Sequence, residues 1–179
     1  MNQNQPKNLL LGDSITAGFD TARLVPELAI RNEGVSGDST AELLSRLRPE
    51  WLQTPGLRAV FVCIGTNDLA RARTDDYILG QITRIVDELR RADGAFRVVL
   101  TSLFPTRDNE PRPNARIVGF NARLAALVVE LGVEFWPLHQ HFLDEDGQLQ
   151  AGFTDDGLHL TVAAYEEWAA RLRAFNMVL

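Results

Sequence analysis

Three side chains of this sequence have the chemistry needed for nucleophilic catalysis, although they lie at opposite ends of the chain. Ser14 is close to the start, and Asp156 and His159 are close to the end. A serine hydroxyl is a weak nucleophile unless a base takes its proton, and the usual base is an imidazole that a carboxylate holds in one tautomer. Because Asp156 precedes His159 by three residues, a short turn can bring its carboxylate to one ring nitrogen while the other faces Ser14. The spacing therefore indicates acyl transfer by a Ser-His-Asp triad.

Acyl transfer also needs hydrogen-bond donors for the negatively charged oxygen of its tetrahedral intermediate. The donors that we expect there are the backbone N–H of Ser14, the backbone N–H of Gly37 and the side-chain amide of Asn67. Backbone carbonyls near the imidazole can replace the carboxylate in orienting it, so we expect Asp156→Asn to cost less activity than His159→Ala. Taken singly, Ser14 also fits a helix N-cap, and Asp156 fits a simple turn.

The elements that must position these residues follow from the distribution of apolar side chains. Short apolar runs alternate with amphipathic segments, which is typical of a parallel sheet with helices on both faces. The strands are expected at Asn8–Leu11, Leu28–Arg31, Ala59–Ile64, Phe96–Leu103 and Val133–Trp136, and the helices at Ser39–Leu47, Asp75–Arg91, Asn114–Leu131 and Thr161–Phe175. We predict a single α/β domain over residues 1–179, a three-layer α/β/α sandwich around a flavodoxin-like sheet of five parallel strands.

Sheets of this kind bind ligands at the carboxyl ends of their strands, near the point where the strand order reverses. Ser14 follows the first predicted strand, Gly37 the second and Asn67 the third, and the segment from Asp156 to His159 follows the fifth. We therefore expect these segments to meet at one edge of the sheet.

The walls of the substrate pocket are expected to come from Leu69, from the loop between Phe104 and Asn114, and from Phe153. A chain of 179 residues has little length beyond the sheet and its covering helices. We therefore expect no lid domain and a shallow, solvent-open site.

The composition restricts the partners. The 18 Lys and Arg residues are outnumbered by 24 Asp and Glu residues, for a net charge of −6, so no basic field is available to bind nucleic acid. Cys63 is the only cysteine, and no Cys/His spacing typical of a metal site occurs. There is no apolar run of membrane-spanning length and no signal-peptide pattern. We expect a cytoplasmic monomer or homodimer that acts on a small-molecule ester without metal or cofactor.

Other classes of protein share the predicted topology. A flavodoxin-like electron carrier would bind a phosphate with the loop after the first strand, at residues 13–18. A phosphoacceptor receiver domain needs a lysine after its fifth strand, and this class is excluded because Lys7 is the only lysine. A non-catalytic relative that binds a ligand stays open as well.

Four blocks of the sequence occur together in one known superfamily. They are, in chain order, Gly12-Asp13-Ser14, Ser36-Gly37-Asp38-Ser39-Thr40, Gly65-Thr66-Asn67-Asp68 and Asp156-Gly157-Leu158-His159. With these blocks the chain resembles the SGNH (GDSL-type) esterases and lipases over nearly its whole length. The resemblance implies Ser14 as nucleophile, Gly37 and Asn67 as oxyanion donors, and His159 with Asp156 as the base and its orienting group.

Within this superfamily, residues 32–47 together with Leu158-His159-Leu160-Thr161 and Tyr165 look most like the branch of the platelet-activating-factor acetylhydrolase catalytic subunits. That resemblance implies a single-domain, cofactor-free hydrolase that prefers short acyl groups such as acetyl. It leaves open whether the substrate is a simple ester, an acetylated carbohydrate, a thioester or a phospholipid acetyl ester.

Overall fold

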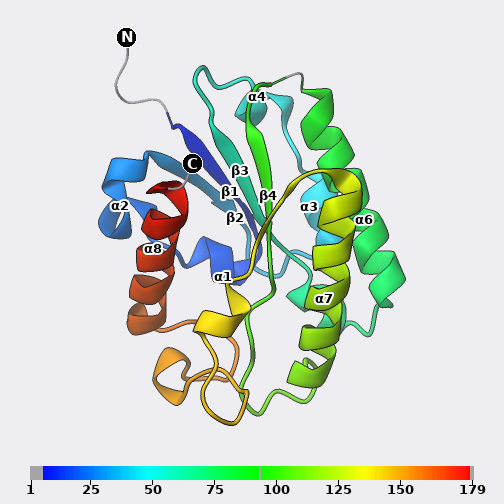
Figure 1. Ribbon diagram of the computed structural model, residues 1–179, viewed down its shortest axis with the longest axis vertical. Helices are drawn as coiled ribbons and strands as arrows, with labels where there is room; N and C mark the ends of the chain where they lie inside the picture. The colour runs from blue at the N-terminus through cyan, green and yellow to red at the C-terminus, as the bar shows by residue number, and fades with distance from the viewer. Residues whose placement is uncertain (1–5, 93, 178–179) are drawn as a thin grey trace.

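The computed structural model describes residues 6–92 and 94–177, which form one parallel sheet with helices on both faces (Figure 1). Neighbouring strands all pair in parallel, in the order β2-β1-β3-β4-β5. The strands are β1 (Asn8–Gly12), β2 (Ile30–Gly34), β3 (Ala59–Cys63), β4 (Arg97–Thr101) and β5 (Glu134–Trp136). The predicted three-layer α/β/α sandwich with a flavodoxin-like strand order is confirmed.

The helices form one layer on each face of the sheet. One face is covered by α3 (Thr40–Ser45), α6 (Asp75–Arg91) and α7 (Asn114–Leu131), and the other by α2 (Thr21–Leu24) and α8 (Val162–Met177) (Figure 1). The shorter elements are α1 (Ser14–Ala17), α4 (Pro49–Leu52), α5 (Thr66–Ala70) and the 3-10 turns η1 (Pro26–Leu28), η2 (His139–His141) and η3 (Ala151–Phe153).

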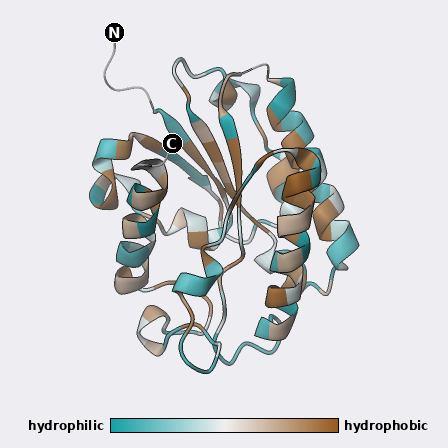
Figure 2. Ribbon diagram, in the orientation of Figure 1, coloured by the Kyte–Doolittle hydropathy of each residue, from teal (hydrophilic) through white to brown (hydrophobic). Residues whose placement is uncertain are grey.

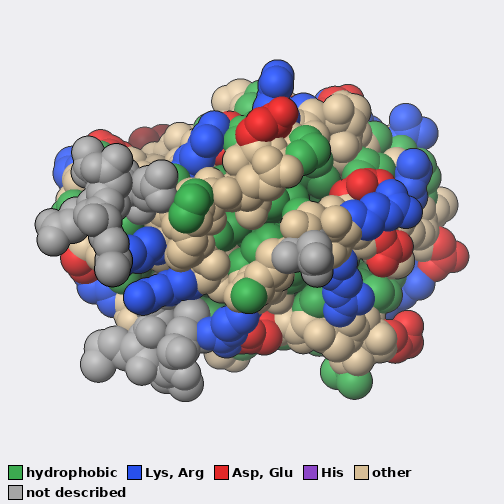
Figure 3. All heavy atoms as spheres, turned by 90° about the horizontal axis from the view of Figure 1, so that it is seen from above, with side chains coloured by type: hydrophobic (Ala, Val, Ile, Leu, Met, Phe, Trp, Pro, Cys, Tyr) green, Lys and Arg blue, Asp and Glu red, His purple; other side chains and the backbone are tan. Residues whose placement is uncertain are grey.

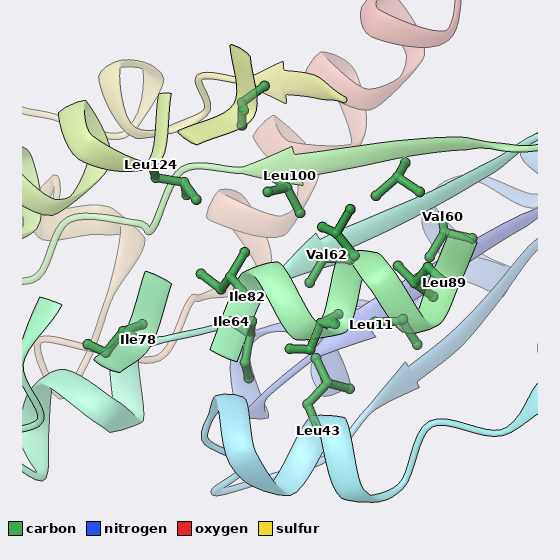
Figure 4. Close-up of a cluster of buried hydrophobic side chains, with 14 of the residues drawn as sticks. Leu11, Leu43, Val60, Val62, Ile64, Ile78, Ile82, Leu89, Leu100 and Leu124 are labelled. Atoms are coloured by element: carbon green, nitrogen blue, oxygen red, sulfur yellow. The ribbon is translucent and has the colours of Figure 1, made fainter. Parts of the chain in front are cut away.

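Two separate cores hold these layers together, because successive side chains of a strand point to opposite faces. Leu11 of β1 points into the core under α3, α6 and α7, where it lies with Leu43 and Ile82 (Figure 4). Leu10 points into the other core, which α8 closes with Trp168. With both faces covered, the central strands are apolar along nearly their whole length (Figure 2), as expected for buried parallel strands.

The two long helices of the first layer have the bounds that their periodicity predicts. The apolar stripe of α6 is fully buried, and Thr74 caps its start by accepting a hydrogen bond from the N–H of Tyr77. Helix α7 ends at Gly132, whose left-handed φ of 60° costs a glycine little. Strong 3.6-residue periodicity thus located these helices from sequence alone.

The second strand was predicted two residues too early. It runs over Ile30–Gly34, because a 3-10 turn begins at Pro26 and Ala29 takes a left-handed φ of 47° before the strand can start. As an edge strand, β2 is only half-buried and contains polar residues. It therefore lacks the apolar run that marked the other strands.

No helix within residues 6–92 and 94–177 is both long and apolar enough to cross a membrane. The face at the amino ends of the strands carries basic and acidic side chains interspersed with one another (Figure 3). The field over this face is accordingly mixed in sign.

Gly34 is a position where the fold tolerates no side chain. A Cβ there would lie 2.3 Å from the backbone nitrogen of Ala17, so β2 and α1 would have to separate. We predict that Gly34→Ala lowers the free energy of unfolding by about 1–3 kcal/mol, as overpacking does, measured by urea unfolding. Gly80→Ala is the control, because Gly80 lies exposed in α6 with open space at its Cβ, and it should raise stability by about 0.5–1 kcal/mol. Equal effects of the two substitutions would contradict the prediction.

Candidate active site

The register of the three central strands sets the position of the site. Gly12, at the end of β1, is level with Gly34 of β2 and with Cys63 of β3. The strand order reverses between β1 and β3, which is where open α/β sheets bind ligands. The loops that carry Ser14, Gly37 and Asn67 therefore leave the sheet at one level and at one edge.

Ser14 is the first residue of α1 and follows directly on β1. The N-cap of this helix is Asp13, whose Oδ1 accepts a hydrogen bond of 3.0 Å from the N–H of Ile15. The interpretation of Ser14 as a mere N-cap is therefore wrong, and its hydroxyl is free for another partner. That partner is His159, whose Nε2 lies 3.0 Å from Ser14 Oγ.

The imidazole of His159 is held on its other side by Asp156. Its Nδ1 lies 2.6 Å from Asp156 Oδ2, while Oδ1 accepts from the backbone N–H groups of His159 at 2.7 Å and Leu158 at 2.9 Å. These bonds, above all the one from the imidazole, hold the pKa of Asp156 well below its usual range. An ionised Asp156 requires the proton on Nδ1, which leaves Nε2 as the acceptor for the hydroxyl of Ser14.

The site is open to solvent, since the side chains of His159 and Asp156 are 52% and 54% exposed. Their loop follows β5, at the far edge of the sheet, and must cross back to β1. The backbone N–H of Arg107 bonds to the carbonyl of Gly157 at 2.8 Å, and a Cβ at Gly157 would lie 2.1 Å from the Arg107 carbonyl oxygen. Only glycine permits this approach, so Gly157 fixes the loop against its neighbour.

Helix α8 makes the second connection between the two halves of the site. The hydroxyl of Tyr165 donates to the carbonyl of Ile15, the residue after Ser14, at 2.8 Å. The helix that begins beside His159 is thereby tied to the helix that presents Ser14. Tyr165 entered the sequence analysis through resemblance alone, and the structure supplies a physical reason for it.

The three expected oxyanion donors lie on the loops that leave this edge. Gly37 occupies a turn closed by the bond from Asp38 N to Val35 O at 3.2 Å, and its φ is +83°. Among the described residues, the N–H groups of Gly37 and Ser14 have no acceptor. The Asn67 amide reaches the same loop, because its Nδ2 donates to the Asp38 carbonyl at 2.9 Å. Two free backbone donors and one amide proton are thus available.

The loops are braced by a buried carboxylate. Asp68 accepts from the N–H and the hydroxyl of Thr40, both at 2.8 Å, which ties α5 to the start of α3. Burial raises the pKa of Asp68. Its place in the protein interior agrees with a bracing role and keeps it apart from the reacting atoms.

The expected pocket walls need correction. Leu69 is 1% exposed and Phe104 is 3% exposed, and each belongs to one of the two cores. Such side chains pack the layers together and leave no surface for a substrate. Phe153 is half-buried against Phe142 and stays a candidate wall. The burial of Leu69 and Phe104 depends on the packing of α5 and α8 against the sheet, which their positions along the chain do not indicate.

Arg112 lies in the loop between Phe104 and Asn114 that was expected to line the pocket, but the sequence assigned this residue no role of its own. It lies between β4 and α7, where its Nε donates to the carbonyl of Thr66 at 3.0 Å and its Nη2 donates to Asn67 Oδ1 at 3.1 Å. An arginine in a proline-rich loop is an ordinary surface residue by sequence, so no local signal marked it. No group of three or more metal-ligating side chains occurs in the part of the chain that the structure describes.

A flavodoxin-like sheet brings a serine, a histidine and an aspartate into contact at its carboxyl edge, and these are the groups that serine ester hydrolases use. The model of the GDSL-like lipase/acylhydrolase family matches residues 10–167, and the chain belongs to this family. Platelet-activating factor acetylhydrolase IB subunit alpha2 of Rattus norvegicus is 26% identical over 184 residues, covering 98% of this chain and 78% of the relative. Subunit alpha1 of the same enzyme from Rattus norvegicus is 29% identical over 168 residues, which cover 90% of this chain and 71% of that relative.

Solved structures agree with this assignment. A protein of Streptococcus pneumonia named for platelet activating factor superposes with a TM-score of 0.88 at 26% identity, covering 98% of this chain and 86% of that one. An acetylxylan esterase of Geobacillus stearothermophilus has a TM-score of 0.68 at 21% identity, covering 97% and 95%, and it shares the fold. The protein is accordingly a carboxylic ester hydrolase.

Asp13 gives the site a pH-dependent stability. Complete burial is the main cause that raises the pKa of Asp13 to about 7, whereas the unfolded chain has the ordinary value near 3.8. A raised pKa means that the folded state binds the proton more tightly. This contribution to stability is therefore complete below pH 4 and is lost as the pH rises toward 7.

We predict that Asp13→Asn abolishes the loss of stability between pH 4 and 7, because asparagine does not ionise. Its side-chain oxygen can still accept the hydrogen bond from Ile15 N–H that caps α1. The free energy of unfolding of the variant relative to wild type should rise by up to about 1.4 kcal/mol per pH unit between pH 4 and 7, and should level off above that. Urea unfolding across this range measures it. Asp20→Asn, at the exposed N-cap of α2, controls for exchanging a capping carboxylate for an amide. A difference between Asp13→Asn and wild type that is constant with pH would contradict the prediction.

Proposed function

We propose that the protein hydrolyses esters of short acyl groups, acetyl above all, through an acyl-enzyme formed on Ser14. The observation that carries the proposal is the continuous chain of contacts from Ser14 Oγ to His159 Nε2 at 3.0 Å and from His159 Nδ1 to Asp156 Oδ2 at 2.6 Å. These are the distances that a general base needs to take a proton from a nucleophile.

In the proposed reaction, His159 Nε2 takes the proton of Ser14 as Oγ attacks the acyl carbon. The N–H groups of Ser14 and Gly37 and the amide of Asn67 stabilise the negative oxygen of the tetrahedral intermediate. His159 then gives the proton to the leaving alcohol, and an acyl-enzyme ester remains on Ser14. Water attacks this ester with His159 again as the base, which releases the carboxylic acid and restores the hydroxyl.

The short acyl preference is supported by the relatives and by the shape of the site. The curated relatives are named for an acetylhydrolase, and one structural neighbour is an acetylxylan esterase. The histidine and aspartate are more than half exposed, while Leu69 and Phe104 are buried in the cores. A long acyl chain would therefore find little apolar surface. The single domain, the monomeric or homodimeric state and the cytoplasmic location stay predictions.

The second candidate function is phosphate binding of the flavodoxin type, in which the loop after β1 would hold the phosphate. The side chains at this loop do not favour that function. A phosphate-binding loop offers donors to an anion, whereas here the carboxyl group of Asp13 is buried in the loop itself. The loop after β2 adds a second buried carboxyl group, that of Asp38, which pairs with Arg46. A carboxyl group there adds negative charge on ionisation. The geometry favours nucleophilic catalysis over phosphate binding.

Loss of the nucleophile or base should abolish hydrolysis while leaving the fold intact. We predict that Ser14→Ala and His159→Ala each lower kcat for p-nitrophenyl acetate by at least about 10³-fold, because neither the nucleophile nor its base can be replaced by solvent at comparable rate. Circular dichroism and thermal melting serve as folding controls. Full activity of a folded Ser14→Ala variant would show that Ser14 is not the nucleophile.

For Asp156 the structure changes the expectation from sequence. Two backbone N–H groups point at Oδ1, so the oxygen of an asparagine there would face them and its NH2 group would face Nδ1 of His159. That contact favours the wrong imidazole tautomer. We predict that Asp156→Asn costs nearly as much activity as His159→Ala under the same assay. A loss of less than about tenfold would restore the view that backbone carbonyls orient the ring.

Acyl-chain selectivity tests the substrate class. We predict that kcat/KM for p-nitrophenyl esters is highest for acetyl and butyryl groups and falls steeply from octanoyl onward, because no long apolar wall is available to bind additional methylenes. Acetylated sugars in the same assay test the alcohol side. A kcat/KM that rises with chain length up to palmitoyl would contradict the short acyl preference while leaving ester hydrolysis in place.

A further inference from the structure

The guanidinium of Arg112 lies where three loops of the site come together. Its Nε donates to the carbonyl of Thr66 at 3.0 Å, and its Nη2 donates to Oδ1 of Asn67 at 3.1 Å. The side chain is half-buried, and its charge interacts with the carboxylates of Asp13 and Asp156. Arg112 is therefore a cation placed between the nucleophile loop, the Asn67 loop and the histidine loop.

The amide of Asn67 is held at both ends by these contacts. Nδ2 uses one of its two protons for the Asp38 carbonyl at 2.9 Å, and Oδ1 accepts from Arg112. An amide that flipped would place its NH2 group against the guanidinium and its oxygen against the Asp38 carbonyl, which are two unfavourable contacts. The second Nδ2 proton is consequently kept in one direction, available to an external acceptor.

We propose that Arg112 is a positioning residue for the oxyanion hole, which fixes the Asn67 amide and strengthens its free N–H as a donor. The inference rests on the proposed function, since it assigns Arg112 a part in the same reaction. A charged donor on Oδ1 polarises the amide, and hydrogen bonds in series reinforce one another in this way. The effect appears when negative charge develops on the substrate oxygen, that is, in the transition state.

Arg116 provides a matched comparison on the same segment of chain. One helical turn further on, its Nη1 donates to the carbonyl of Leu69 at 3.2 Å, and its Nη2 pairs with Asp75 at 3.2 Å. Arg116, in α7, thus bonds to a backbone carbonyl of α5, as Arg112 does from the loop that precedes α7. Its hydrogen bonds go neither to the amide of Asn67 nor to Ser14, His159 or Asp156, so its loss measures the bracing contribution alone.

The test is steady-state hydrolysis of p-nitrophenyl acetate by Arg112→Gln, Arg112→Lys and Arg116→Gln. We expect Arg112→Gln to lower kcat between about 10- and about 100-fold with KM nearly unchanged, because a displaced donor is felt in the transition state. Arg112→Lys should lose a similar factor, since lysine keeps the charge but lacks the planar fork that reaches both acceptors. Arg116→Gln should stay within about twofold of wild type.

A double-mutant cycle with Asn67→Ala isolates the coupling. Asn67→Ala alone should lower kcat by about 10²–10³-fold as the loss of one oxyanion donor. In that background, Arg112→Gln should cost less than a further factor of about two, because the amide that it positions is gone. Such non-additivity would not arise if Arg112 only braced the loops.

Several results would overturn the inference. These are a wild-type kcat for Arg112→Gln, an undiminished effect in the Asn67→Ala background, an equal loss in Arg116→Gln, full activity of Arg112→Lys, or a rise in KM alone. Circular dichroism checks folding, and a structural collapse of both Arg112 variants would assign the residue to stability instead. If Ser14→Ala is inactive while these variants behave as wild type, only the inference fails. If Ser14→Ala stays active, the proposed function is wrong, and the inference about Arg112 is then wrong as well.

Discussion

The proposed active site depends on the close approach of backbones at the end of β1. Gly12 is level with Gly34 and Cys63 on its two sides, and a Cβ at Gly12 would lie 2.4 Å from the Cys63 carbonyl oxygen. The last turn of α1 packs against the end of β2, so Ser14 at the start of this helix is positioned by backbone packing and by the Asp13 cap. Because the neighbouring strands end at the same level, the loops that carry Gly37 and Asn67, the proposed oxyanion donors, reach Ser14 without any long connection.

The surroundings of Asp13 and Asp156, two carboxyl groups near Ser14 and His159, shift their pKa values in opposite directions. Burial raises the pKa of Asp13 to about 7, while three hydrogen bonds in an exposed loop keep Asp156 ionised. In the proposed reaction, Asp156 is therefore the anion that stabilises the imidazolium of His159, while Asp13 caps the start of α1. Environment rather than residue type separates the two roles.

The loop that carries Asp156 and His159 is positioned by contacts between side chains and backbones that are distant in the sequence. This loop leaves β5 at the edge of the sheet and is tied to the centre through Gly157 against Arg107 and through Tyr165 against Ile15. These contacts join segments that are about 50 and 150 residues apart in the sequence. The contacts among Ser14, His159 and Asp156 thus depend on the packing of α8 and of the β4–α7 loop as much as on these three residues.

The sequence by itself determined the fold class, the bounds of α6 and α7, and the residues that the structure brings into contact at Ser14, Asp156 and His159. The fold class and the helix bounds follow from local periodicity. The three residues were recognisable because serine, histidine and aspartate occur together in few functions other than nucleophilic catalysis. The start of β2, the burial of Leu69 and Phe104, and the contact of Arg112 with Asn67 were decided only by the tertiary structure. Each of them depends on which surfaces meet across the sheet, and neither residue type nor spacing along the chain carries that information.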